Sequence, residues 1–446
     1  MAGERARADD LRTAEGYPTA REAWYTVGVL YCAYLLAFVD RQILAYLVDP
    51  IRAQFGISDL QFSLVSGFVF VLLTSLLAIP ISVLADNRRR RSLIAIGMGI
   101  WSLAALLSSR AMGLLTLGLS RCGVALGQSA LVPASISQIA DSFPPDRRGL
   151  ALNVHAAGVH GGIGLSNFFG GWVVAAVAAM SGFTMPLIGF VAPWQIALAL
   201  VAIPCAIVAV LVLTLREPRR QSRTHMPREV TLEETIAYVR SHWFVYASLI
   251  FGAAFSAIGS YGMFAWVPAV FMRLFGWSAG PVGLVFGALT LVLGTAGLVL
   301  SGVYVGTFVR RGADIVYQRL MMLAIACAIV PGAISITADS AITMWLCIAA
   351  VIFFLGMPIG LAPAALVAIT PNKMRAQVIA VYAAVINVIG LGLGPVLVAL
   401  LTDFVFMNDA AVARSMGIVI VVSGVLGVLL LSFSVRSYEE LGRTAG

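Results

Sequence analysis

The sequence is poor in charge. Only 11% of its 446 residues are Asp, Glu, Lys or Arg, whereas 60% are hydrophobic and the mean hydropathy is +0.95. A soluble domain is about 25% charged and about 45–50% apolar. Because so few charges cannot coat a water-facing surface, the composition excludes a soluble enzyme, a disordered chain and a collagen-like fibre.

Cysteine and lysine are also scarce. Lysine occurs once, at Lys373, beside 28 arginines, a bias typical of GC-rich bacteria that favours a bacterial inner membrane. The five cysteines lie within apolar runs, at spacings that fit neither a disulfide framework nor a metal site, so we expect no metal and no cofactor. They are Cys32, Cys122, Cys205, Cys327 and Cys347.

Long apolar runs are abundant instead. A membrane-spanning helix needs about 20 such residues, and the runs predict an all-α polytopic membrane protein with twelve spans. The predicted spans are 24–48, 60–85, 92–110, 114–141, 149–178, 190–215, 243–271, 279–308, 317–337, 341–369, 376–402 and 412–435.

The positive charges are divided unequally between the two membrane faces. Both tails and the connections on one face hold 23 of the 29 Lys and Arg residues, the other face holds 4, and two lie within spans. Cytoplasmic segments carry such an excess, so we expect both termini to be cytoplasmic. The net charge of +8 is then explained by the orientation of the chain in the membrane, so we expect no nucleic-acid partner. Because the first 23 residues are polar, we expect no cleavable signal peptide.

The longest polar stretch divides the spans six and six. Within it, Thr231 to Glu234 has the form of a capping box, followed by apolar residues at helical spacing, which predicts a short amphipathic helix on the membrane surface. A flexible linker is the alternative. The predicted parts are a cytoplasmic tail (1–23), an N-terminal six-helix bundle (24–215), a cytoplasmic linker (216–242), a C-terminal six-helix bundle (243–436) and a second tail (437–446).

The two halves of the sequence are similar to each other at an offset of 227 residues. Val154-His155-Ala156-Ala157 aligns with Val381-Tyr382-Ala383-Ala384. Small residues four apart, such as Gly123/Gly127 and Gly390/Gly394, allow helix backbones to approach closely in lipid. Together with the six-plus-six division, these matches indicate an internal duplication, which is typical of transporters that rock one half against the other.

Three charges lie well inside predicted spans, away from the span ends, where each costs about 3 kcal/mol on insertion scales and indicates a functional site. Asp40 and Arg41 are in the first span and Arg121 is in the fourth. At 1.5 Å per residue, Asp40 and Arg121 lie about 14 and about 10 Å from the outer span ends, so they can pair. Gln128 follows Arg121 by two turns on the same helix face. Asp40 is either part of a fixed structural pair or a carrier that changes protonation as the cavity opens to each side.

The candidate residues for a substrate cavity lie on the fifth, seventh, tenth and eleventh spans. His155 and His160 are about 140° apart around a helix, so both cannot face it, and each is either a packing residue or a partner in proton coupling. The seventh and tenth spans carry aromatic residues, among them Phe255, Trp266 and Phe354, which suit an amphipathic solute but also fill ordinary cores. The cavity residues that we predict are His155, Ser256, Ser260, Tyr261, Phe264, Phe353, Met357 and Asn387.

Further patterns resemble a known family. Asp86 with Arg88 to Arg91 resembles the loop motif of the major facilitator superfamily, and Leu119-Ser120-Arg121 with Gly127 resembles its fourth-span arginine motif. Within the superfamily, the first half of the chain is similar to the Spinster branch. The residues that carry this likeness are Asp40-Arg41, Pro133, Asp141-Ser142-Phe143 and Arg147-Arg148.

The resemblance implies two six-helix bundles that work by alternating access, with a cavity lined by spans one, four, seven and ten. Spinster relatives in animals are associated with lysolipid and sphingosine-phosphate export, and some of them are proton-coupled. Position 128 is normally glutamate in this branch, whereas Gln128 cannot titrate and mimics a permanently protonated acid. The implied coupling site is Asp40, Arg41, Arg121 and Gln128, and the implied cytoplasmic latch between the halves is Asp86, Arg88, Arg89, Arg90, Asp141, Arg147 and Arg148.

The function expected from the sequence is secondary active transport, driven by the proton gradient, of an amphipathic or lipid-like solute. We expect a monomer surrounded by membrane lipids. A carrier of a small organic anion such as a hexuronate and a multidrug efflux pump are alternatives, and a receptor or scaffold without transport is a further one. Because no phosphate-binding loop stands outside the spans and no nucleophile–base pair is apparent, we expect neither an ATP-driven pump nor an enzyme.

Overall fold

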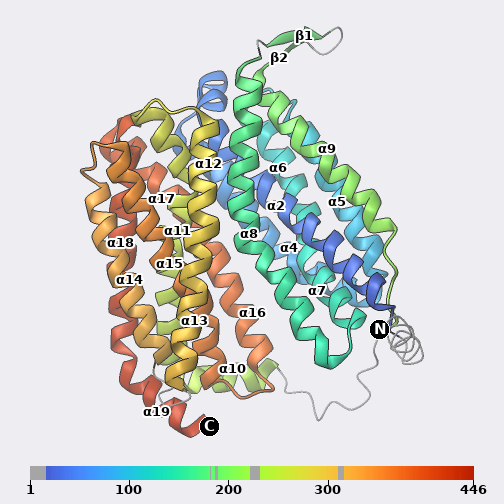
Figure 1. The fold of residues 1–446 in the computed structure, drawn as a ribbon, viewed down its shortest axis with the longest axis vertical. Coiled ribbons are helices and arrows are strands. Elements are labelled where there is room, and N and C mark those ends of the chain that lie inside the picture. The colour runs from blue at the N-terminus through green and yellow to red at the C-terminus, as the bar shows by residue number, and fades with distance from the viewer. Residues whose placement is uncertain (1–16, 181, 186–188, 221–231, 310–315, 446) are drawn as a thin grey trace, which may run out of the picture. The chain divides into compact units, whose positions relative to one another are not determined.

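The structure, a computed structural model, describes residues 17–180, 182–185, 189–220, 232–309 and 316–445. Within these ranges, twelve helices are long and apolar enough to cross a membrane, which confirms the predicted number of spans and the all-α class (Figure 1). The chain packs into two units. The first comprises Met1–Ile57, Leu72–Thr224 and Ala279–Gly287, and the second comprises Ser58–Val71, His225–Ser278 and Ala288–Gly446.

The first unit is built mainly from the early spans. Its first helix begins before the predicted span because Thr19 and Glu22 form a capping box, and it ends at Gly56, whose φ of 63° is left-handed. The helices are α2 (Ala20–Phe55), α4 (Val69–Asn87), α5 (Arg90–Ser108), α6 (Leu114–Ser129), α7 (Leu131–Ser142), α8 (Pro145–Ala178) and α9 (Pro193–Leu213).

The fourth span is broken between α6 and α7. Pro133 lacks the N–H that would bond to the carbonyl of Ser129, so the helix is interrupted there. Before the break, α6 touches α5 backbone to backbone, because a Cβ added at Gly97 would lie 2.7 Å from the Gly127 carbonyl oxygen. This contact is the close approach that the Gly123/Gly127 pair predicts.

The second unit holds the later spans, several of which contain π-helical turns, a feature frequent at functional sites. The π-helical segments are η1 (Leu64–Phe68), η2 (Thr290–Gly294), η3 (Ile386–Leu393) and η4 (Leu401–Phe406), and η5 (Asp409–Ala411) is a 3₁₀ turn. The α-helices are α3 (Asp59–Ser63), α10 (Leu232–Ser241), α11 (Trp243–Leu274), α12 (Ala279–Leu289), α13 (Thr295–Val309), α14 (Val316–Ser335), α15 (Ala341–Ile369), α16 (Arg375–Val385), α17 (Gly394–Leu400), α18 (Val412–Phe433) and α19 (Val435–Ala445). In this list α12 begins within the first unit.

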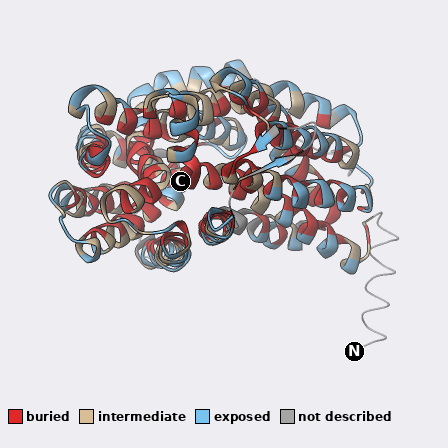
Figure 2. Ribbon diagram, turned by 90° about the horizontal axis from the view of Figure 1, so that it is seen from above, coloured by how far each residue is buried: buried red, intermediate tan, exposed pale blue. Residues whose placement is uncertain are grey.

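In both units, buried residues lie where helices face one another and exposed residues lie on the outward faces (Figure 2). Helix α10 of the linker packs on α11 and α16, and the Tyr238 hydroxyl donates to the Ile369 carbonyl at 3.3 Å. Thr231, which opens the predicted capping box, lies outside the described residues.

One element was not predicted. Strands β1 (Phe183–Met185) and β2 (Gly189–Val191) form an antiparallel hairpin between α8 and α9, with Thr184 opposite Phe190 (Figure 1). The sequence predicts spans over 149–178 and 190–215, so the end of β2 falls inside the predicted sixth span. Strands of three residues are too short to give a readable alternation of apolar and polar residues.

Candidate functional site

Four polar side chains meet between α2 and α6 inside the first unit. Arg121 Nη1 donates to Asp40 Oδ2 at 3.0 Å, and Gln128 Nε2 donates to the same oxygen at 3.3 Å. Arg41 donates from Nε and Nη2 to Gln128 Oε1, at 3.2 and 2.9 Å. The structure thus joins the four residues that the sequence assigns to coupling, and we call them the coupling cluster.

The core of the coupling cluster is buried. Asp40 and Arg121 are each 2% exposed, and Gln128 is 4% exposed. Burying one charge alone is very costly, but a hydrogen-bonded pair of opposite charges is tolerated. Asp40 and Arg121 therefore depend on each other for burial.

Packing of α6 sets the direction of these side chains. The backbone contact of Gly127 with α5 fixes the rotation of α6, and residues seven apart lie on nearly the same helix face. Arg121 and Gln128 are consequently both turned toward α2. Gln128 stands two residues before the break at Ala130, so the cluster lies beside an irregular point of the fourth span.

A second polar group, which sequence reasoning missed, ties α2 to α8. Asn167 Oδ1 accepts from Gln42 Nε2 at 3.1 Å and from the Tyr46 hydroxyl at 3.2 Å, while Asn167 Nδ2 donates to the Ile163 carbonyl at 3.0 Å. Asn167 is completely buried. An amide inside an apolar span was the available signal, because a buried polar group needs partners.

His155 of the fifth span is not joined to the coupling cluster by any contact that the structure describes. His155 is 4% exposed and stacks on Tyr34, with ring centroids 5.1 Å apart. Its Nδ1 has no hydrogen-bond partner among the described residues. The side chain of His160 lies outside what the structure describes.

The predicted cavity residues of the second unit have varied surroundings. Ser256 and Ser260 are buried and donate to carbonyls of their own helix, Ala253 at 2.8 Å and Ser256 at 3.2 Å. Trp266 belongs to the core, since it is 2% exposed and its Nε1 donates to the Pro395 carbonyl at 2.9 Å. Asn387 is exposed within η3, whereas four others are half-buried: Tyr261, Phe264, Phe353 and Met357.

A third network surrounds Arg90 at the start of α5, again within the first unit. Arg90 is 1% exposed, its Nη1 bonds to Asp141, and its Nε donates to Glu217 Oε1 at 2.9 Å. The Glu217 carboxylate also accepts the backbone N–H groups of Arg90 and Arg91, at 3.1 and 2.9 Å. It thereby caps the positive end of α5.

Sequence reasoning found Arg90 and Asp141 but missed Glu217, which lies far away along the chain. The other residues expected at the latch are not joined to this network by any contact that the structure describes. Arg88, Arg89 and Arg147 are exposed and Arg148 is half-buried, whereas the Asp86 side chain lies outside the described part.

Known transporters match the chain along most of its length. It resembles the MFS-type efflux pump of Mycolicibacterium smegmatis (28% identity over 63% of this chain and 62% of the relative). It also resembles the sphingosine-1-phosphate transporter SPNS2 of Danio rerio (26% identity over 62% of this chain and 55% of the relative). The chain thus spans about three fifths of the length of the curated relatives it matches.

The fold has solved counterparts. A bacterial homolog of the human lysosomal transporter Spinster, in an inward-facing and unoccupied conformation, superposes with a TM-score of 0.75 at 24% identity. The match covers 95% of this chain and 98% of that one. The model of the Major Facilitator Superfamily matches residues 30–395. The chain therefore belongs to the major facilitator superfamily.

Proposed function

We propose that the chain is a secondary active transporter that works by alternating access and draws on the proton gradient without a cofactor. The observation that carries this proposal is the coupling cluster, a buried carboxylate held by an arginine and an amide within spanning helices. Membership of a transporter superfamily supports it.

Asp40 is the group in the coupling cluster that can exchange a proton. Arginine stays protonated in proteins and an amide does not titrate, which excludes Arg41, Arg121 and Gln128 as carriers. An anionic solute that binds Arg121 would compete with Asp40 for the arginine's N–H groups. The carboxylate would then lose its partner and take up a proton, so binding of solute and proton would be linked.

The solute that we propose is amphipathic or lipid-like, of the lysolipid or sphingolipid type. The half-buried aromatic residues of α11 and α15 suit an apolar tail, and Arg121 suits an anionic headgroup. The name of the relative SPNS2 supports the same class. A small organic anion and a multidrug substrate remain the alternatives, and counterflow against a panel of all three classes at two pH values separates them.

The decisive experiment compares net transport with exchange in proteoliposomes. We expect Asp40→Asn to abolish uptake driven by an imposed pH gradient but to retain solute exchange, because exchange need not move a proton. Arg121→Ala should impair both. Asp339→Asn, which removes an exposed carboxyl outside the spans, is the matched control and should behave as the parent. If Asp40→Asn concentrates solute as well as the parent does, Asp40 is a fixed structural partner and proton coupling through it is wrong.

Position 128 offers a second test. Gln128→Glu adds a titratable group 3.3 Å from Asp40, within reach of Arg41. We expect transport to depend more steeply on pH and to become more concentrative. Initial uptake rates of both forms are compared against the same imposed pH gradients, and equal slopes would exclude position 128 from coupling.

We further propose a monomer in a bacterial inner membrane with both termini in the cytoplasm. The 23 to 4 division of Lys and Arg supports this orientation. In that orientation the Arg90 network lies at the cytoplasmic face, and we propose it as part of the cytoplasmic latch.

A further inference from the structure

The second span begins with a buried ion pair that no sequence motif indicated. Asp59, the first residue of α3, is completely buried, and the Arg273 side chain near the end of α11 is 8% exposed. Arg273 Nη1 donates to Asp59 Oδ2 at 2.7 Å and Nη2 donates to Oδ1 at 2.8 Å. Such a two-pronged pairing of arginine and carboxylate is the strongest and most directional ion pair that side chains form.

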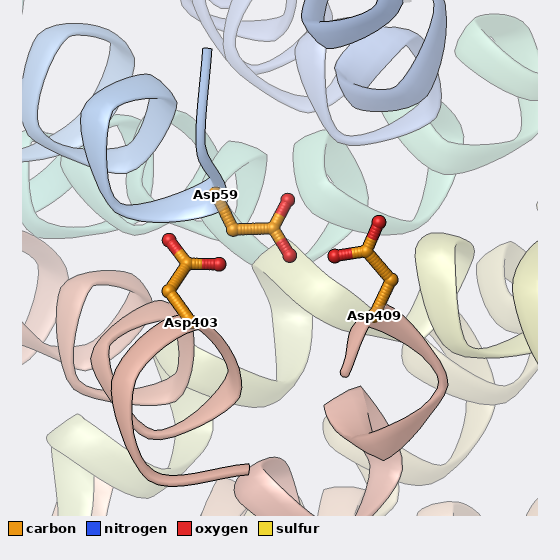
Figure 3. A group of neighbouring side chains, drawn as sticks. All are labelled: Asp59, Asp403 and Asp409. Atoms are coloured by element: carbon orange, nitrogen blue, oxygen red, sulfur yellow. The ribbon is translucent and has the colours of Figure 1, made fainter. Parts of the chain in front are cut away.

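A second contact holds the same helix end. Asp403 of η4 accepts the backbone N–H of Leu60 at 2.7 Å. A carboxylate at this place satisfies a free N–H of the helix and interacts favourably with the positive helix end. Figure 3 shows Asp59 and Asp403 close to Asp409, and one carboxylate oxygen from each of the three lies within 4.8 Å of the other two.

The positions of Asp59, Arg273 and Asp403 in the chain indicate which parts of the molecule these contacts hold together. By chain order Asp59 opens the second of the first six spans, yet Ser58–Val71 packs in the unit that holds the later spans. The predicted topology puts the three connections that contribute Asp59, Arg273 and Asp403 on the noncytoplasmic face. Opening of a central cavity to that face requires the early spans to part from the later ones there.

A π-helical turn follows the ion pair at once. Segment η1 begins at Leu64 and packs on η3, where a Cβ added at Gly392 would lie 3.2 Å from a ring carbon of Phe68. Short π-helical insertions interrupt the regular bonding of a helix and are frequent at functional sites. The second span is therefore held in place at its first residues, and its helix is irregular just after them.

We propose that Asp59, Arg273 and Asp403 form an outer latch, which holds the tip of the second span on α11 and η4 and releases it when the cavity opens to the noncytoplasmic face. The inference rests on the proposed alternating access. A buried ion pair is strongly destabilised when one partner is removed, because the other charge is left uncompensated. Loss of Arg273 thus leaves the Asp59 carboxylate without this ion pair and weakens the docking of the tip.

The test measures access to the latch and needs no solute. Ser63, one turn after Asp59, is 3% exposed, and Ser63→Cys provides a reporter in a full-length chain whose five native cysteines are replaced by alanine. Intact cells are treated with a membrane-impermeant maleimide. We expect labelling to be at least tenfold faster with Arg273→Gln than with the reporter alone. We expect a smaller increase with Asp403→Asn, which retains a hydrogen-bond acceptor.

Two further variants serve as controls for this test. Arg414→Gln removes an exposed cation from the same predicted face and should leave the labelling rate unchanged. The charge exchange Asp59→Arg with Arg273→Asp restores an ion pair and should bring the rate back toward that of the parent, provided that each variant elutes as the parent does in size-exclusion chromatography. Arg273→Lys, which retains the charge but not the two-pronged contact, replaces Arg273→Gln if the latter fails to fold.

The outer latch is wrong if Arg273→Gln or its lysine substitute labels as slowly as the parent, or if Arg414→Gln accelerates labelling equally. Because the readout involves neither solute nor protons, it stands apart from the Asp40→Asn transport assay. Failure of proton coupling leaves the labelling result intact, and failure of the latch leaves the transport result intact.

Discussion

Removing Asp40 and Arg121 one at a time is predicted to destabilise the protein more than removing both. The Asp40→Asn change leaves Arg121 2% exposed without its carboxylate, and arginine cannot shed its charge. Breaking a buried ion pair from one side costs about 3–5 kcal/mol. Replacing both partners, with Asp40→Asn and Arg121→Gln, leaves neutral amides that can bond to each other and removes most of that cost.

The double-mutant cycle therefore has an expected coupling energy of about 3 kcal/mol for this pair. For a folding unit of roughly 200 residues, 1 kcal/mol corresponds to about 2–4 °C in Tm. We expect Asp40→Asn to melt about 6–20 °C below the parent and the double variant to recover more than half of that loss. The measurement is thermal unfolding of purified protein in one detergent, followed by tryptophan fluorescence.

An exposed ion pair of nearly the same length provides the control. Arg319 Nη2 and Glu439 Oε1 are 2.9 Å apart, but their side chains are 63% and 30% exposed. Solvent-exposed pairs contribute about 0–1 kcal/mol, so the same cycle on Arg319 and Glu439 should give a shift of no more than a few degrees. If the buried pair couples no more strongly than the exposed one, the view that Asp40 and Arg121 depend on each other for burial is refuted.

Three further predictions concern packing, the cytoplasmic network and topology. Gly97→Ala should lower the free energy of unfolding by about 1–3 kcal/mol in the same assay, because its Cβ would lie 2.7 Å from the Gly127 carbonyl oxygen. Gly99→Ala is the control and should not lower the Tm, because a Cβ there would meet no atom within 4 Å. Arg90→Gln should cost about 2 kcal/mol, because it deprives Asp141 and Glu217 of a charged donor; a Tm unchanged from the parent would contradict this. A reporter enzyme that is active only outside the cytoplasm should stay silent when fused after Gly446, and strong activity would overturn the predicted orientation.

Much of the fold could be predicted because membrane spans obey a simple rule. Runs of about 20 apolar residues have one stable solution in lipid, the helix, so the number of spans follows from composition and spacing. The ends were less well predicted. Helix α8 begins at Pro145, four residues before the predicted span, because a helix continues through polar residues beyond the apolar stretch that identifies it.

The coupling cluster was predictable for a related reason. A charge within an apolar run is conspicuous, and Asp40 and Arg121 could be matched by their estimated depth before their 3.0 Å contact was known. Glu217 and Asp59 gave no such signal, since each stands in a polar connection where acidic residues are ordinary. Their importance comes from partners distant in sequence, Arg90 and Arg273, and only the fold brings those partners to them.

Gln128 shows how one neutral side chain can serve two charges. Its amide nitrogen donates to Asp40 while its amide oxygen accepts from Arg41. A protonated glutamic acid offers the same combination, one donor and one acceptor, but an ionised glutamate can only accept. An ionised glutamate would therefore repel Asp40 across 3.3 Å while binding Arg41 more strongly. The amide thus reproduces the hydrogen bonds of the protonated acid in both directions. The coupling cluster therefore holds the hydrogen bonds of a protonated acid at position 128, and in the proposed mechanism Asp40 is left as the group that exchanges a proton.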